Sequence, residues 1–321
     1  MSETITRANA QSWGSGTLLQ TTLNEKVLQN FEPSMYFYGL WEKPMWSDKT
    51  NTMMWARFGR LLQTPAQSIL TEWVTPSNIS FDASTITMTA TQYGMYVTLA
   101  DMLVDKQPIN FILWAGSEIG KNMGRIIDTI IQDNLLSGNI NTLYGGDATS
   151  RATIDATDVL TGLDLVKADT FLTAKASPRI DGYYLGVFSQ NVIYDLRIDT
   201  DAKGWLEANK YVTPEKIFKG EIGALNGIRV MQNPFVRPLA STVTVYPNFF
   251  FGAGSFWVSE FQSLKNYITP RVSSDSDPLA QRVKVGSKVA FWTVILNNDS
   301  LLIIETSASV NYVSDFNPAP Q

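Results

Sequence analysis

A run of about thirty residues between Pro108 and Ser137 constrains the fold more than any other stretch of the chain. At 100° per residue, its apolar and small residues gather on one side. The charged residues Glu118, Lys121, Arg125 and Asp128 gather on the other. A helix of this length would extend roughly 45 Å, whereas helices average about 11–12 residues. We therefore expect one long amphipathic helix that spans a whole lobe of the protein.

The ends and the glycines of this run agree with a helix. Pro108 suits the first turn and Gly138 the position just past the end. Gly116 and Gly120 lie on the apolar face, where the lack of a side chain lets another segment approach closely. A membrane span is the rival interpretation, and the charged face together with Asp133 argues against it.

Two extended segments precede the helix, at 50–62 and 84–99, separated by a loop that contains prolines. The second segment begins with threonines that alternate with apolar residues, and it would reach about 50 Å, where strands usually have about 5–6 residues. We expect a long hairpin that outgrows its own domain and gains most of its burial on another subunit. The alternative is a bent strand in a compact sheet, with Gly94 marking a bulge.

The stretch from residue 35 to 55 is crowded with aromatic side chains. A platform for sugars or bases is one interpretation, and it would make the chain a carbohydrate-binding module. We favour packing within the fold or against a neighbouring chain, because aromatic side chains dominate core and interface energetics. The residues concerned are Tyr36, Phe37, Tyr38, Trp41, Trp46 and Trp55.

After the long helix, the sequence predicts a small lobe of mixed helices and strands. Residues 138–151 form a polar linker, and Thr157 is placed to cap a helix over 158–176. A buried type of strand at 183–188 is followed by a brief helix at 190–196, capped by Ser189.

In the C-terminal third of the chain, the sequence pattern predicts mostly strands. Segments 282–296 and 301–306 are expected to pair as a hairpin, because Asn297, Asn298, Asp299 and Ser300 between them suit a turn. Shorter strands are predicted at 226–232, 242–247, 249–253 and 256–261.

Two residue types are missing altogether, since the chain contains neither histidine nor cysteine. Ser-His-Asp and Cys-His mechanisms, disulfides and thiolate zinc sites are therefore excluded. Catalysis would have to rest on carboxylates, lysine or tyrosine, and no cofactor is predicted. The formal net charge of −5 provides no global basic field, which argues against tight, sequence-independent nucleic-acid binding by the protomer.

The N-terminal stretch is polar and no window approaches 18 apolar residues, so neither a cleaved secretion signal nor a transmembrane helix is expected. A chain made and used in a cytoplasm fits this pattern best.

Candidate chemical motifs are weak. Asp195, Asp199 and Asp201 lie close together but lack the glycine and closing glutamate of a calcium loop, so we expect solvated carboxylates at a helix end. Gly252 and Gly254 follow a strand without the third glycine of a dinucleotide site. No catalytic, cofactor-binding or metal-binding residue is assigned. A carboxylate-based glycosidase stays open as an alternative, because the separation of its two carboxylates is a spatial property.

Several motifs in one order carry a family resemblance. DLR at 195–197 is followed by Trp205, Tyr211 and EKIFKGEIGALNGIR at 215–229, and SDPLAQRVKVGSK follows at 276–288. These motifs resemble the major capsid proteins of podoviruses of the N-four type, and the similarity covers roughly residues 30–308.

The chain departs from that family at two places. Phe188-Ser189-Gln190 stands where relatives often carry His-Pro, and Ser287 stands where an aromatic residue is common. Neither change argues against the fold, but a role tied to that histidine does not carry over.

The resemblance implies an α+β protein with the Hong Kong 97-like phage capsid fold. That fold has an N-terminal arm, an extended two-stranded loop, a long spine helix, and peripheral and axial domains. On this basis the chain divides into the arm at 1–34, the extended loop and its roots at 35–104, the spine helix at 105–154, a mostly axial domain at 155–260, and a return to the peripheral domain with a C-terminal hairpin at 261–321.

The function implied is that of a structural major capsid protein and not of an enzyme. It would self-assemble into hexamers and pentamers of an icosahedral shell that encloses double-stranded DNA without binding it specifically. Its partners would be further copies of itself, together with scaffolding, portal and decoration proteins. It would be found in the virion capsid after assembly in the bacterial host cytoplasm, with no membrane partner. An encapsulin-like nanocompartment enclosing protein cargo is the alternative within the same fold.

Subunit contacts are predicted at large apolar side chains that the protein's own core does not require. They are Trp55, Trp73 and Met88 on the hairpin, with Phe111 and Trp114 on the polar side of the long helix.

Overall fold

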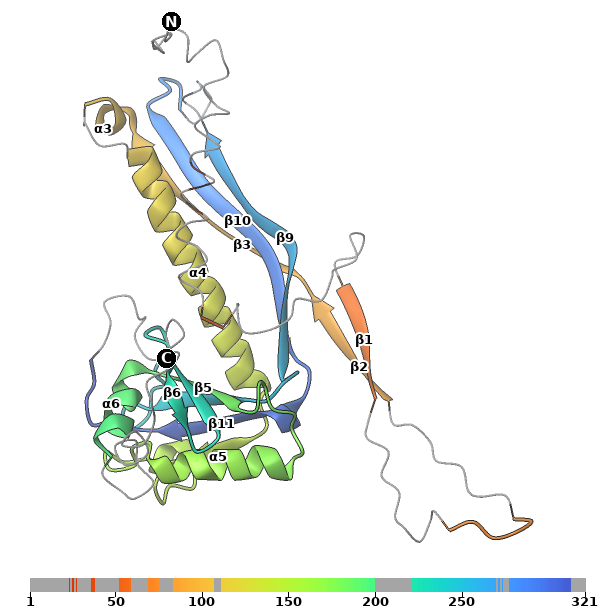
Figure 1. The fold of residues 1–321 in the computed structure, drawn as a ribbon. Helices are drawn as coiled ribbons and strands as arrows, with labels where there is room; N and C mark the ends of the chain where they lie inside the picture. Colours follow the sequence, from red (N-terminus) through yellow and green to blue (C-terminus); the bar gives the residue numbers. More distant parts are fainter. Residues whose placement is uncertain are drawn as a thin grey trace, which may run out of the picture.

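The protein is built from a long helix, three sheets and several short helices, which a computed structural model describes over most of the chain (Figure 1). The predicted arm lies outside the described residues apart from three positions, as do Tyr38, Trp41, Trp46, Pro108 and Asp201. The described residues are 23, 25, 27, 36–37, 52–58, 69–74, 83–106, 111–199, 221–269, 271, 273 and 277–312.

The long helix is α4, Phe111–Gly138, and it follows a short helix, α3, Asp101–Lys106. Its 28 residues confirm the expected spine, and one face is buried along the whole length. Asp128 corrects the sequence-based assignment, because it is fully buried and not on the solvent face. The reason is that a segment remote in sequence, residues 36–37, covers that side of the helix.

The glycines of α4 allow a close approach, as expected. Leu23 and Val27, both helical, lie against Gly116 and Gly120. A Cβ atom on Gly120 would lie 2.5 Å from the carbonyl oxygen of Val27, which is too close for any larger residue. Gly116 and Gly120 therefore allow the helical residues Leu23 and Val27 to pack directly against the backbone of α4.

A three-stranded antiparallel sheet runs beside α4. Its strands are β3, Thr91–Ala100, β10, Arg282–Ile295, and β9, Phe256–Thr269, in that order. Val283 and Val285 of β10 pack with Ala115 and Ile119 of α4, so the helix covers one face of the sheet.

A six-stranded sheet forms the core of the lower lobe in Figure 1. Its order is β4, Thr142–Tyr144, β11, Leu301–Thr306, β8, Tyr246–Phe251, β5, Tyr184–Phe188, β7, Ile228–Gln232, and β6, Glu221–Leu225.

Helices cover both faces of this sheet. Phe249 packs in the cluster that contains the α4 residues, whereas the neighbouring Phe250 packs in the cluster of α5, Gly162–Ala174, and α6, Gln190–Ile198. Strands β5, β8 and β11 are buried at every position, as expected of strands covered on both sides. The predictions of a buried strand near 183–188 and of a helix after Ser189 are confirmed.

A two-stranded ribbon projects from this body (Figure 1). Strands β1, Thr52–Phe58, and β2, Ala83–Thr89, pair antiparallel from Thr52 opposite Thr89 to Phe58 opposite Ala83. The expected long strand at 84–99 changes partner at Ala90, because β2 belongs to the ribbon and β3 to the three-stranded sheet. Gly94 marks no bulge between β3 and β10, since it stands in register with Lys288.

Two local predictions were wrong. Helix α5 begins at Gly162, with Thr161 as its N-cap, and not after Thr157. Thr161 donates its N–H and its hydroxyl to Asp164, and these bonds fix the first turn. The expected linker at 138–151 contains strand β4 and is followed by a 3₁₀ turn, Arg151–Thr153.

The expected C-terminal hairpin was also wrong, because β10 and β11 belong to different sheets. The backbone N–H groups of Leu296 and Asn297 donate to the carbonyl of Ser255, so β10 ends beside the start of β9. A 3₁₀ turn, Asn298–Ser300, then redirects the chain into the six-stranded sheet.

Candidate assembly surfaces

The hairpin is joined to the body through a small apolar cluster. Met88 and Ala90 are buried against Trp292 of β10. Trp55 meets Trp257 edge to face, with ring centroids 5.0 Å apart. These contacts fix the direction in which the ribbon leaves the body.

One polar contact adds to the apolar cluster at the base of the hairpin. The guanidinium of Arg57 donates to the side-chain oxygen of Asn297, at 2.9 Å, and so ties β1 to the turn between β10 and β11. The contact is exposed, so its contribution to stability is small, and the apolar cluster carries most of the attachment.

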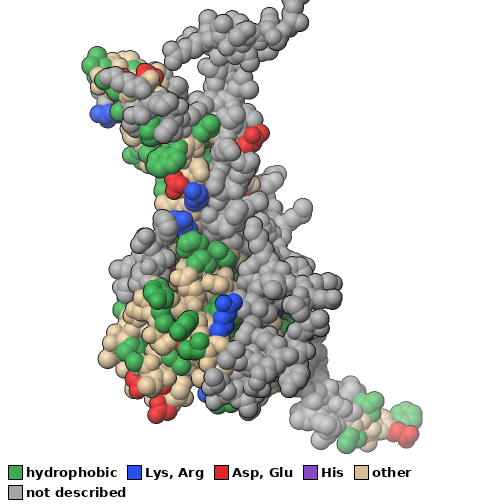
Figure 2. Space-filling view, turned by 60° about the vertical axis from the view of Figure 1, so that its left-hand side comes forward, with side chains coloured by type: hydrophobic (Ala, Val, Ile, Leu, Met, Phe, Trp, Pro, Cys, Tyr) green, Lys and Arg blue, Asp and Glu red, His purple; other side chains and the backbone are tan. Residues whose placement is uncertain are grey.

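The segment at the far end of the hairpin, residues 69–74, exposes almost all of its apolar surface. Ile69 and Leu70 are 73% and 75% exposed, and Trp73 is 101% exposed. Trp73 has a φ of 65°, a conformation that bulky residues rarely adopt. Figure 2 shows this tip standing apart from the body. An apolar group of this kind usually marks a binding surface.

The start of α4 carries a second aromatic pair. Trp114 is 56% exposed, and its ring lies edge to face with that of Phe111 at 6.4 Å. Phe111 also packs partly against the cluster that contains Leu23 and Ile119. One turn further on, the Lys121 ammonium pairs with Glu118 at 2.8 Å.

The five predicted contact residues therefore differ in what they offer a neighbouring subunit. Trp73 and Trp114 are exposed, Trp55 is 42% exposed beside Trp257, and Phe111 is half-buried. Met88 is only 3% exposed, so its side chain already packs within its own subunit. The contacts of these five residues with a neighbouring subunit stay predictions.

The segment that precedes the hairpin has an anchor on α4 that no local sequence pattern indicated. The Asp128 carboxylate accepts the backbone N–H of Tyr36 at 2.8 Å and of Phe37 at 3.1 Å. Phe37 is fully buried, with its ring 5.4 Å from that of Phe249. Burial, together with the negative charge of Asp128, raises the pKa of Tyr36. The described aromatic residues at 36–37 are thus packed within the fold.

The buried carboxylates serve structural bonds. Glu305 accepts from both the Nε and an Nη of Arg151, and this hydrogen bonding raises the pKa of the Arg151 guanidinium. Asp195 accepts from the backbone N–H and the hydroxyl of Ser309, so the expectation of a solvated carboxylate there was wrong. The half-buried Asp199 likewise accepts the N–H of Gly162, at 2.9 Å.

Within the described ranges, no group of three or more acidic side chains is placed to hold a metal ion. No helix of those ranges is long and apolar enough to cross a membrane.

Residues 221–229 of the family-like motif, EIGALNGIR, form a hairpin in the six-stranded sheet. Asn226 and Gly227 both have positive φ, 50° and 80°, as a two-residue turn of type I′ requires. They connect β6 to β7, and the Arg229 guanidinium then lies 5.7 Å from the ring centre of Tyr183. The Asn-Gly pair of this motif is therefore explained by the turn that it forms between β6 and β7.

No protein-family model matches the chain, and no protein of curated function matches its sequence. Solved structures do match over most of its length. The capsid of Ralstonia phage GP4 has a TM-score of 0.67 at 17% identity, covering 84% of this chain and 87% of that chain. The capsid of cyanophage Pam1 gives 0.68 at 14% identity, covering 88% and 93%. That of cyanophage P-SCSP1u gives 0.62 at 13% identity, covering 86% and 89%.

The fold is the Hong Kong 97-like capsid fold.

The expected capsid fold is thereby confirmed, with its extended two-stranded loop in β1 and β2 and its spine helix in α4. At identities of 13–17% the capsid likeness concerns the fold alone. The narrower resemblance to podoviruses of the N-four type stays a prediction, as do the five domain boundaries.

Proposed function

We propose that this chain is a major capsid protein, a structural and non-enzymatic subunit of a phage shell. The capsid fold over most of the chain is the observation that carries the proposal. The exposed apolar tip of the hairpin supports it, because a lone subunit gains nothing by holding such side chains in water.

The subunit would self-assemble into hexamers and pentamers of an icosahedral shell that encloses double-stranded DNA. In this mechanism the hairpin of one subunit lies on the peripheral domain of the next, so each contact joins two different surfaces and closes into a ring. The net charge of −5 suits a shell that encloses DNA without specific binding. Assembly in a bacterial cytoplasm, with scaffolding, portal and decoration proteins as partners, belongs to the same proposal.

Expression of the chain alone, followed by sedimentation velocity and negative-stain imaging, tests the proposal. Closed shells or capsomer-sized rings are the expected result. If the chain stays monomeric at all salt and protein concentrations, a second experiment co-expresses it with the neighbouring phage genes. If that experiment also yields no particle, the capsid function is wrong.

The contents of the particles separate the two functions that share this fold. Nuclease-protected double-stranded DNA in particles from infected cells is expected for a phage capsid. Particles that hold a protein cargo and no DNA would instead indicate an encapsulin-like compartment.

A further inference from the structure

The face of the three-stranded sheet that points away from α4 carries a groove with an unusual lining. Strand register places Gly286 of β10 directly between Tyr96 of β3 and Tyr267 of β9. The next positions on the same face of β10 are Lys284 and Lys288, one on each side of Gly286. Two tyrosines thus flank a glycine across the strands, and two lysines flank it along the central strand.

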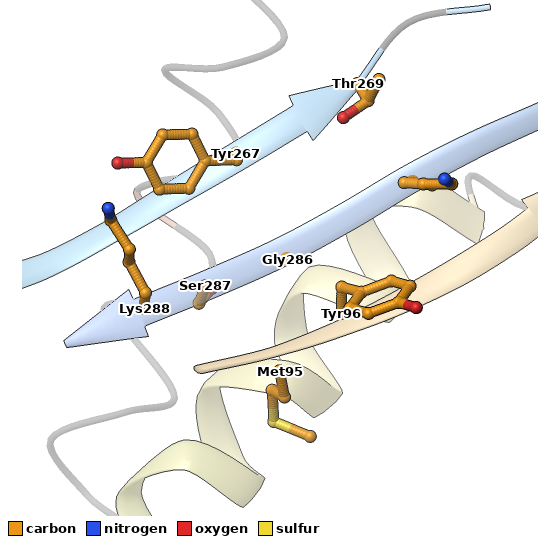
Figure 3. A pocket seen from close by; sticks show the side chains of 8 residues that line it. Met95, Tyr96, Tyr267, Thr269, Gly286, Ser287 and Lys288 are labelled. Atoms are coloured by element: carbon orange, nitrogen blue, oxygen red, sulfur yellow. The ribbon is translucent and has the colours of Figure 1, made fainter. Parts of the chain in front are cut away.

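The glycine makes the hollow. A Cβ atom at Gly286 would lie 2.9 Å from the carbonyl oxygen of Met95 and 2.9 Å from the Cβ atom of Tyr96. Without it, a cavity of about 350 Å³ opens between the flanking side chains. In Figure 3, Tyr267 and Lys288 stand on the open side of the sheet, and Met95 points toward α4.

The charge of this face is opposite to that of the whole chain. Lys265, Arg282, Lys284 and Lys288 lie along it, while Glu260 is the one acidic residue in strands β3, β9 and β10. The Lys288 ammonium lies 5.4 Å from the ring centre of Tyr267. The groove therefore suits a ligand with an aromatic group and a negative charge side by side.

The hairpin tip of the chain carries such a pair with both side chains exposed. At the hairpin tip, the exposed Glu72 precedes Trp73, whose ring is held entirely in solvent. In Figure 1 the tip points away from the three-stranded sheet, so the groove that it fits belongs to another copy.

We propose that the groove between Tyr96 and Tyr267 is the docking site for the hairpin tip of a second copy of this chain. Trp73 enters over Gly286 between the two tyrosines, and Glu72 lies between Lys284 and Lys288. The inference deepens the proposed capsid function and rests on it, because it names the receiving surface for the hairpin. Burial of an indole between aromatic rings supplies affinity, and the charge pair fixes the direction of entry.

The absence of cysteine from the natural chain allows a clean cross-linking test. Two double variants, Glu72→Cys with Lys288→Cys and Val74→Cys with Lys284→Cys, are assembled into particles and oxidised. A ladder of covalent oligomers that collapses on reduction is expected for at least one pair. The single variants, and Glu72→Cys with Ile140→Cys at an exposed position between α4 and β4, are controls that should give no ladder.

A second measurement does not depend on assembly. The receptor is the full-length Trp73→Ser chain, which lacks the key group of its own tip. The probe is a fluorescent cyclic peptide with the sequence of residues 67–76, QSILTEWVTP. Saturable binding is expected, about tenfold weaker when the peptide carries Glu72→Lys or when the receptor carries Lys284→Glu with Lys288→Glu. Restored binding between the two charge-reversed partners would confirm the pairing.

The two proposals fail in different ways. Particles that form without a ladder, with a peptide that does not bind, overturn the docking site and leave the capsid function standing. Peptide binding without any particle supports the docking site and counts against the shell. A short oligonucleotide that binds this groove in place of the peptide, and loses affinity in the Lys284→Glu, Lys288→Glu chain, would reassign the surface to nucleic acid.

Discussion

At the level of single residues, buried carboxylates hold together segments that are remote in sequence. Asp128 of α4 receives two backbone N–H groups from residues 36–37. Asp195 accepts a hydrogen bond from the backbone N–H of Ser309, and Glu305 accepts one from the guanidinium of Arg151. Backbone N–H groups buried without an acceptor cost about 1–3 kcal/mol each, so these carboxylates are structural and their removal leaves unpaired donors.

Replacing Asp128 by alanine should lower the free energy of unfolding by about 3 kcal/mol, because two N–H groups lose their acceptor. Urea unfolding of the unassembled chain measures the effect. Asp133→Ala is the matched control on the same helix, since Asp133 is half exposed and pairs with Arg237, and it should cost about 0.5 kcal/mol. Equal losses in the two variants would contradict the anchor.

The raised pKa of the Tyr36 hydroxyl predicts that the protein loses stability at alkaline pH. Burial and the charge of Asp128 raise its pKa above the value of 10.0 for a free phenol. Between these two pKa values the folded state binds more protons than the unfolded state. The stabilisation is therefore complete below about pH 10 and is lost as the pH rises through the folded pKa.

Unfolding free energies measured from pH 8 to pH 11 test this prediction. Tyr36→Phe keeps the ring but removes the titrating group, so its stability should fall less steeply above about pH 10. Tyr312→Phe, at an exposed position, is the control and should follow the wild type. A Tyr36→Phe curve parallel to the wild type would show that the alkaline loss originates elsewhere.

At the level of elements, the hairpin differs from every other strand pair. Among the described residues, strands β1 and β2 pair with each other and with no third strand, whereas β9, β10 and β3 form a sheet backed by α4. An isolated two-stranded ribbon is marginally stable in water. Its order in a single subunit therefore depends on the cluster of Met88, Ala90 and Trp292 at its root.

Met88→Ala should loosen the hairpin without unfolding the body. Removing a buried methionine side chain costs about 3 kcal/mol, so amide exchange in β1 and β2 should accelerate by about 100-fold. Met54→Ala, on the same ribbon but 70% exposed, should leave exchange almost unchanged. If Met88→Ala weakens particles and leaves the free subunit unaffected, the side chain acts between subunits, as the sequence-based prediction had it.

At the level of the whole molecule, the described chain divides into a packed body and a projecting hairpin. The body is stabilised by clusters on both faces of the six-stranded sheet and along α4. Within the described part of the chain, no strand pairs with the outer edges of the hairpin, and its tip is apolar. This distribution suits a subunit that completes its folding on a neighbour.

Hydrogen exchange of free and assembled protein should reveal that difference. Amides of β1 and β2 should become strongly protected on assembly, because their open edges and exposed side chains become covered. Amides of β5 and β8, which lie inside the six-stranded sheet, should exchange equally slowly in both states. Equal exchange of the ribbon in both states would mean that the hairpin is not a subunit contact.

Periodicity alone was sufficient where an element has one dominant environment. The apolar face of α4 and the alternation around Met88 are local patterns that one buried side explains, and the continuous apolar strand at 184–188 is explained by burial on both sides. The position of α5 was missed because both Thr157 and Thr161 suit an N-cap, and only Thr161 has Asp164 to share its bonds.

Local residue patterns were sufficient to predict the long helix and the threonine-faced hairpin and to exclude histidine and cysteine chemistry, because each depends on residue types at short spacing. Strand pairing, the burial of Asp128 and the row formed by Tyr96, Gly286 and Tyr267 depend instead on contacts between distant segments. Register between strands that lie far apart in the chain depends on packing against α4 and the other sheet. No window of sequence contains that information.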